Sequence, residues 1–144
     1  MQLGATRHIG RRADEVFAFF SDASNNPKWQ TGMVSCEWTT PPPIDIGSRY
    51  TQVARFMGRS VESKFVVTEY EPGRLIAIET EESTFPIAVR RTVTPLDDSS
   101  CQVEAVIGGG PEKGPLRWLT PLVQRRAQKS VDADYDRLVV LLES

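Results

Sequence analysis

The stretch GPLRWLTPLVQRRAQKSVDADYDRLVVLLES, residues 114–144, decides which fold the chain adopts. Its apolar residues recur at four-residue steps, which places them on one face of an α-helix. These residues are Leu119, Val123, Ala127, Val131 and Tyr135, continued by Leu138 and Leu142. Most of the charged residues between them fall on the other side of the helix. A helix this long with one apolar face requires a large apolar surface to pack against.

Pro121 lies inside this helical pattern, and two interpretations follow. Proline in a helix interior removes one backbone hydrogen bond and kinks the helix. Proline is also favoured at the first position of a helix, in which case Thr120 caps a new helix that begins at Pro121.

The residues before this helix form a series of short strands separated by turn sequences. The segment Glu71-Pro72-Gly73, for example, has Pro and Gly at positions that β-turns favour. Two short helices follow the first strand, one at 13–21 and one that begins at Pro27 and ends by Gly32. The predicted strands are 2–9, 34–40, 47–57, 59–70, 74–82, 85–95 and 101–108.

The short connections between these strands predict antiparallel pairing, because parallel strands need long crossovers. We therefore expect an α+β fold in which an antiparallel sheet of about seven strands curves around the long C-terminal helix. All 144 residues, 1–144, are expected to form a single domain. A hollow between the sheet and the helix is the place to look for function.

The composition excludes several classes of protein. With a net charge of -2 and no basic cluster, the chain lacks the electrostatic signature of a nucleic-acid-binding protein. Cys36 and Cys101 are too few for a disulfide framework and match no metal motif, which favours a reducing cytoplasm. The first ten residues lack the apolar run of a signal peptide, and no segment is apolar enough to span a membrane.

Several segments carry a resemblance to a known superfamily. They are ADEVFAFFSD at 13–22, Pro27-Lys28-Trp29, VTEYEPGRL at 67–75, and the helix segments 126–134 and 138–143. In these segments the chain resembles the START/Bet v 1-like helix-grip superfamily (SRPBCC), in its polyketide cyclase/dehydratase-like branch. The resemblance covers nearly the whole chain and implies the helix-grip fold, with an elongated apolar cavity between the inner sheet face and the long helix. It does not select a function, because the superfamily contains carriers, receptors and cyclases.

The helix stripe is the first predicted part of the cavity wall. We expect Leu119, Val123, Ala127 and Val131 to line the cavity, and the small Ala127 leaves room where a larger residue would fill the core. The alternative is that these side chains pack directly against the sheet.

Arg91 is the main polar candidate, because a buried polar group needs a partner or a ligand. It alternates with Ile87, Val89 and Val93 on one side of its strand. If that side faces inward, Val89 lines the cavity and Arg91 points into it, where a guanidinium binds carboxylate or enolate oxygens. If the strand twists or bulges, Arg91 lies near an end and is solvated.

A second strand offers hydrogen-bonding groups on one face. That face carries Tyr50, Gln52, Ala54 and Phe56. When it points inward, Tyr50 and Gln52 hydrogen-bond a ligand and Phe56 adds apolar wall. The opposite face competes for the inward role; its residues are Thr51, Val53 and Met57.

Two tryptophans lie where the mouth of the cavity is expected. Trp29 offers a large apolar area and one donor for closing over a ligand; alternatively, it anchors the second short helix to the sheet. Trp118 covers the mouth or holds the start of the long helix in place.

Residues for catalysis or metal binding are few. His8, the only histidine, is expected at a solvated position on the first strand, and no metal-ligand set or nucleophile motif is present. We therefore expect no metal and no cofactor. The candidates for a catalytic role are Arg91 and Tyr50, which together could stabilise an enolate, but no base accompanies them.

The sequence favours binding of a small hydrophobic or amphipathic molecule, such as a lipid, a polyketide or an aromatic metabolite. One alternative is a polyketide cyclase/dehydratase-like enzyme that needs no cofactor. Another is a protein-interaction module that uses an exposed apolar patch beside the cavity mouth. The sequence does not specify the ligand or the oligomeric state.

Overall fold

The computed structural model describes residues 2–56, 58–83, 86–108 and 121–144. It contains seven strands, three α-helices and one short 3₁₀ turn in these ranges. In chain order they are β1 (Gln2–Ile9), α1 (Ala13–Phe20), η1 (Ala23–Asn25), α2 (Asn26–Trp29), β2 (Met33–Trp38), β3 (Arg49–Phe56), β4 (Arg59–Glu71), β5 (Leu75–Glu82), β6 (Ala88–Asp97), β7 (Ser100–Gly108) and α3 (Pro121–Glu143).

The seven strands form one antiparallel sheet in the order β1-β7-β6-β5-β4-β3-β2. From β2 to β7 each strand pairs with the next one in the chain, and β1 completes the sheet beside β7. The turns explain this simple order. Gly73, between β4 and β5, has a φ of 78°, a conformation that glycine adopts without steric cost. The predicted antiparallel sheet and the helix-grip arrangement are confirmed.

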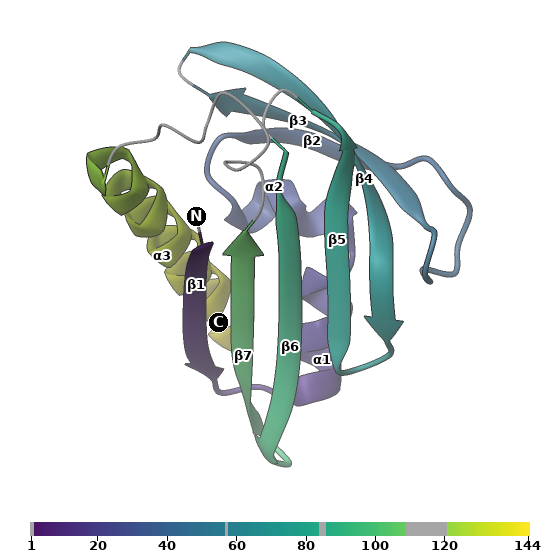
Figure 1. The fold of residues 1–144 in the computed structure, drawn as a ribbon. Coiled ribbons are helices and arrows are strands. Elements are labelled where there is room, and N and C mark those ends of the chain that lie inside the picture. The colour runs from purple at the N-terminus through teal and green to yellow at the C-terminus, as the bar shows by residue number, and fades with distance from the viewer. Residues whose placement is uncertain (1, 57, 84–85, 109–120) are drawn as a thin grey trace.

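The sheet is strongly curled. In Figure 1, β2 and β3 run across the top of the view while β5, β6 and β7 run upright. The pairing of β4 with β5 has two register shifts, at Lys64/Phe65 and at Val67/Glu69. Such bulges increase the local twist and bend a strand, so they allow the sheet to curve around the helices.

The core fills the space between the inner face of the sheet and the helices. Val16 and Phe20 of α1, Val103 of β7 and Leu138 of α3 are all almost completely buried in one continuous cluster. In β6 and β7, alternate residues contribute to this cluster, as expected for a sheet with one buried face.

The long helix begins, in the described part of the chain, at Pro121. The choice between a helix start and an internal kink at Pro121 depends on the residues just before it, which lie outside the described part of the chain. The predicted helical residues 114–120 lie outside the described residues. No described helix combines the length and the apolar character needed to cross a membrane.

Helix α3 lies along the edge strand β1 (Figure 1). The Gln128 side chain bonds both backbone groups of Gly4: its Oε1 accepts from the Gly4 N–H at 3.2 Å, and its Nε2 donates to the Gly4 carbonyl at 2.7 Å. Arg7 of β1 pairs with Asp136 at 2.8 Å and with Asp132 at 3.2 Å. These contacts hold the helix against the edge of the sheet and leave space between the helix and strands β6 and β7.

Candidate functional site

A partly enclosed cavity of about 570 Å³ occupies this space. Its apolar lining comes from the sheet and from α3 and consists of Leu3, Ile87, Val89, Ile107, Val123, Ala127 and Val131. Its aromatic and polar lining consists of Trp29, Gln30, Arg91, Arg126, Ser130, Asp134 and Tyr135. The cavity is thus an apolar compartment with its polar groups contributed by α2, β6 and α3.

Arg91 is the central polar group of the cavity. It is only 7% exposed, because its strand turns the side of Val89 and Val93 inward. Of the two orientations that the sequence left open for Arg91, the structure has the inward one. Its Nε donates a hydrogen bond of 2.8 Å to the Tyr135 hydroxyl, and its guanidinium carbon lies 5.2 Å from the centre of the Trp29 ring. The Trp29 and Tyr135 rings meet edge to face at 5.0 Å.

We call Trp29, Arg91 and Tyr135 the Arg91 cluster. Its members come from α2, β6 and α3, so it exists only when all three elements are in place. Burial opposes the charge on Arg91, but the Tyr135 oxygen favours it, and the pKa of Arg91 is raised above its ordinary value. Arg91 is therefore a charged group inside the protein at any physiological pH.

This buried cation forms no ion pair among the described residues. Of the described residues that line the cavity, Asp134 is the one carboxylate, and it is engaged elsewhere. Its Oδ1 accepts from the backbone N–H of Thr31 at 2.9 Å and from the Thr31 hydroxyl at 2.8 Å, and Arg137 lies 3.3 Å away. Asp134 therefore fastens α3 to the loop after α2 and does not neutralise Arg91.

Trp29 forms part of the cavity wall and is not a cover over its mouth. Its side chain is 1% exposed and packs against the other members of the Arg91 cluster. Its carbonyl accepts a hydrogen bond of 2.9 Å from Arg137 Nη1, which ties α2 to α3. Trp29 therefore anchors α2, in agreement with one interpretation of the sequence, and its ring lines the cavity wall instead of closing over the mouth.

Tyr50 and Gln52 lie outside the lining of this cavity. Tyr50 does face inward, but its ring stacks on Phe65 at 5.0 Å and meets Trp38 at 5.2 Å. Burial raises the pKa of Tyr50, so its phenol stays neutral. Gln52 is half-buried, and its Oε1 accepts a long contact of 3.9 Å from the Cys36 thiol. Sheet curvature carries β3 away from the compartment that β6 and α3 enclose.

The remaining predicted residues divide into two groups. Val89, Val123, Ala127 and Val131 line the cavity. Trp118, Leu119 and the side chain of Phe56 lie outside the described residues, and so does Met57.

Tyr135 is the important lining residue that the sequence reasoning did not place in the site. It lies on the helix stripe one step after Val131, so its position was visible. A tyrosine within an apolar stripe carries a hydroxyl that needs a partner when buried, and this signal could have paired it with Arg91. Gln30 gave no such signal, because it follows a very short helix.

Nucleophilic and metal chemistry find little support in the described residues. Burial raises the pKa of Cys36 to about 11, so its thiol is protonated near neutral pH and is a poor nucleophile. No group of three or more potential metal ligands gathers anywhere in the described ranges.

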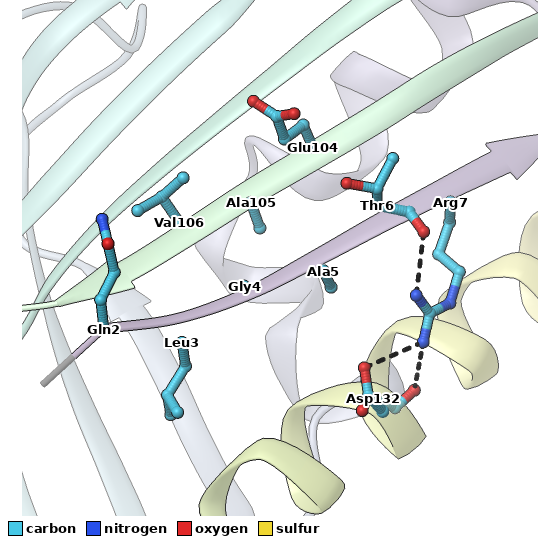
Figure 2. A pocket seen from close by; sticks show the side chains of 10 residues that line it. All are labelled: Gln2, Leu3, Gly4, Ala5, Thr6, Arg7, Glu104, Ala105, Val106 and Asp132. Atoms are coloured by element: carbon cyan, nitrogen blue, oxygen red, sulfur yellow. Dashed lines mark hydrogen bonds and ion pairs between the residues drawn. The ribbon is translucent and has the colours of Figure 1, made fainter.

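A second hollow, of about 470 Å³, lies over β1, β7 and α3 (Figure 2). Two of its charged groups already pair with each other: Arg7 binds Asp132 at 3.2 Å and also donates to the Thr6 carbonyl at 2.9 Å. Much of its wall is the edge strand itself, including Gly4 and Ala5 (Figure 2). The cavity beside the Arg91 cluster is the better candidate, because it offers a larger apolar wall and an unpaired charge.

The curled seven-stranded sheet, the short helices after β1 and the long C-terminal helix together constitute the helix-grip fold of START-type proteins. Within this class the family can be stated. The family model described as "Polyketide cyclase / dehydrase and lipid transport" matches residues 2–143, and the chain therefore belongs to this family. The sequence matches none of the curated proteins.

Solved structures share this fold over nearly the whole chain. A START superfamily protein from Mycobacterium smegmatis has a TM-score of 0.83 at 15% identity, covering 99% of this chain and 97% of that one. The Zhui aromatase/cyclase from Streptomyces sp. R1128 has a TM-score of 0.77 at 13% identity, with coverages of 99% and 93%. A protein from Thermus thermophilus has a TM-score of 0.75 at 19% identity, with coverages of 100% and 100%. These similarities establish the fold and leave the ligand open.

Proposed function

We propose that the protein binds a small hydrophobic or amphipathic molecule in the cavity between β6, β7 and α3. The observation that carries this proposal is the cavity itself, which at about 570 Å³ has the size typical of small-molecule sites. Membership of a family described by polyketide cyclases and lipid transport supports the same conclusion.

The lining explains how such a molecule would be held. Val89, Val123, Ala127 and Val131 remove apolar surface of the ligand from water, which is the main source of affinity in sites of this kind. Arg91 supplies one directional polar contact that orients the molecule. The ligand class is thus an apolar body with one polar end.

Filling the cavity tests the proposal. The neutral fluorescent probe N-phenyl-1-naphthylamine is titrated into the wild type, Ala127→Phe and Ala133→Phe. Ala127 lines the cavity, whereas Ala133 is exposed on the same helix, so the second variant is a matched control. We expect saturable binding of the probe to the wild type and to Ala133→Phe. Ala127→Phe should bind the probe at least about tenfold more weakly than the wild type, because the added ring occupies the apolar space. Equal binding by Ala127→Phe would place the probe elsewhere and contradict the proposal.

A cofactor-independent polyketide cyclase or dehydratase is the second candidate. It is favoured by the bond between Arg91 and Tyr135, since a charged guanidinium inside an apolar cavity can stabilise an enolate. A base is still required, and Asp134, the carboxylate in the lining, is engaged by Thr31 and Arg137. Binding therefore remains the first proposal. The test is incubation with a poly-β-keto thioester, followed by mass spectrometry for loss of water; Arg91→Met should abolish any such turnover.

A further inference from the structure

The polar end of the cavity contains more hydrogen-bond donors than the described residues satisfy. Trp29 Nε1 and Gln30 Nε2 are buried and have no partner in the described part of the chain, and both side chains line the cavity. Of the Arg91 nitrogens, Nε bonds to Tyr135, while neither Nη1 nor Nη2 has a hydrogen-bond acceptor among the described residues. A third unpartnered buried atom, Asn26 Oδ1, is an acceptor, but Asn26 does not line the cavity.

The hydroxyl of Tyr135 adds a further donor. Its oxygen accepts the bond from Arg91 Nε, so its own proton remains available for an acceptor beside Arg91. Buried donors without acceptors are costly, and a buried cation without a counter-ion is more so. Among the described residues, these donors therefore lack the acceptors that a group with several oxygens would bring.

The charges of the lining residues also favour an acceptor group, and one that carries a negative charge. Arg91 and Arg126 are cationic, and Asp134, the opposing carboxylate, is already paired with Arg137. A carboxylate carries a single negative charge and two oxygens that match the two-pronged geometry of a guanidinium. Among the described residues of the lining, Arg91 is the one buried cation, which suits the single charge of a carboxylate better than the double charge of a phosphate.

We propose that the ligand is a carboxylic acid with an apolar body. Its carboxylate binds Arg91, with Tyr135, Trp29 Nε1 and Gln30 Nε2 as further donors, and its apolar part lies along the α3 side of the cavity. This inference rests on the proposed function, because it names the chemical class of the molecule held in the same cavity.

The test uses a matched pair of compounds, 4-hexylbenzoate and 4-hexylbenzamide, which differ in charge and share their apolar body. Each displaces N-phenyl-1-naphthylamine from the wild type, from Arg91→Gln and from Arg90→Gln. Arg90 is the next residue on β6, but it is exposed and pairs with Glu69 at 3.3 Å, so it is a matched control. Trp29→Phe keeps an aromatic ring and removes the Nε1 donor.

We expect the wild type and Arg90→Gln to prefer the benzoate by about 10- to 100-fold, the range expected for a hydrogen-bonded charge pair. Arg91→Gln should bind both compounds within about threefold of each other and keep its affinity for the benzamide. Trp29→Phe should lose about three- to tenfold in affinity for the benzoate alone. Retained benzamide binding shows that the variants are folded.

Three outcomes would contradict the inference. Equal affinity of the wild type for both compounds would overturn the inference that the ligand is a carboxylic acid, while the proposed apolar site would stand. This measurement needs no variant. Binding of the neutral probe without any binding of the benzoate would likewise overturn the inference of a carboxylic acid and leave the proposed apolar site in place. If neither compound nor the probe binds, the proposed function fails together with the inference.

Discussion

The two halves of α3 carry the same apolar stripe but have different surroundings. In the C-terminal half, Leu138 is 0% exposed, and Leu142 is nearly as buried. In the N-terminal half, Val123 is 37% exposed, and Ala127 and Val131 are only partly covered. The C-terminal half packs into the core and the N-terminal half forms the wall of the cavity.

The attachments of the two ends explain the difference. At the C-terminal end, Gly10 donates its backbone N–H to Glu143 at 2.7 Å, and Arg11 donates to the Leu142 carbonyl at 3.3 Å. The N-terminal half is held to the sheet mainly by Gln128 on the edge strand. An apolar stripe on a helix therefore shows which face turns inward, but not whether protein or empty space lies opposite it.

The largest expected effect compares one leucine in each half. Leu138→Ala removes a completely buried side chain, and we expect it to lower the free energy of unfolding by about 2–5 kcal/mol. Leu122→Ala makes the same chemical change at a residue that is 60% exposed, and we expect a loss below about 1 kcal/mol. Urea denaturation of both variants measures the difference. Similar losses would show that the N-terminal half packs as tightly as the C-terminal half.

An intermediate effect is expected at the junction of the two halves. Tyr135→Phe removes the oxygen that accepts from Arg91 Nε and leaves a buried charged donor without its partner. We expect a loss of about 1–3 kcal/mol in the free energy of unfolding. Tyr70→Phe serves as the control, since Tyr70 is half-buried against Phe17 and its hydroxyl has no hydrogen bond among the described residues. If thermal denaturation shows equal losses, the Arg91–Tyr135 bond does not stabilise the fold.

The smallest effect concerns the attachment of the N-terminal half. Gln128→Ala removes both bonds to Gly4, and we expect a loss of about 1–2 kcal/mol, with faster hydrogen exchange at the Gly4 amide. Gln124→Ala, one turn earlier and exposed, should change neither quantity. Unchanged exchange at Gly4 in the Gln128 variant would mean that other contacts hold the helix at the edge strand.

Much of the fold was predictable from local signals. Each hairpin joins neighbouring strands, so turn residues such as Gly73 specify the strand order without knowledge of distant contacts. The two-residue period of a strand also predicted that Arg91 shares a side with Val89. Only the inward direction of that side remained open, because it depends on how the whole sheet curls.

The residues that meet in the site were harder to predict. Arg91 and Tyr135 are 44 positions apart, and nothing in either segment indicates the other. Tyr50 lies on an inward face, one of the two orientations open for its strand, yet its ring stacks on Phe65 outside the cavity lining. An inward side chain reaches the cavity only if its strand lies opposite α3, and the curl of the sheet determines which strands do so.

The sequence by itself determined the elements, their order and which residues share a face, because these follow from periodicity and turn chemistry along the chain. Only the tertiary structure decided that the N-terminal half of α3 borders a cavity and that Arg91 lies there without a counter-ion among the described residues. Both facts depend on the distance between a helix and a curved sheet, and many contacts far apart in the sequence set that distance together.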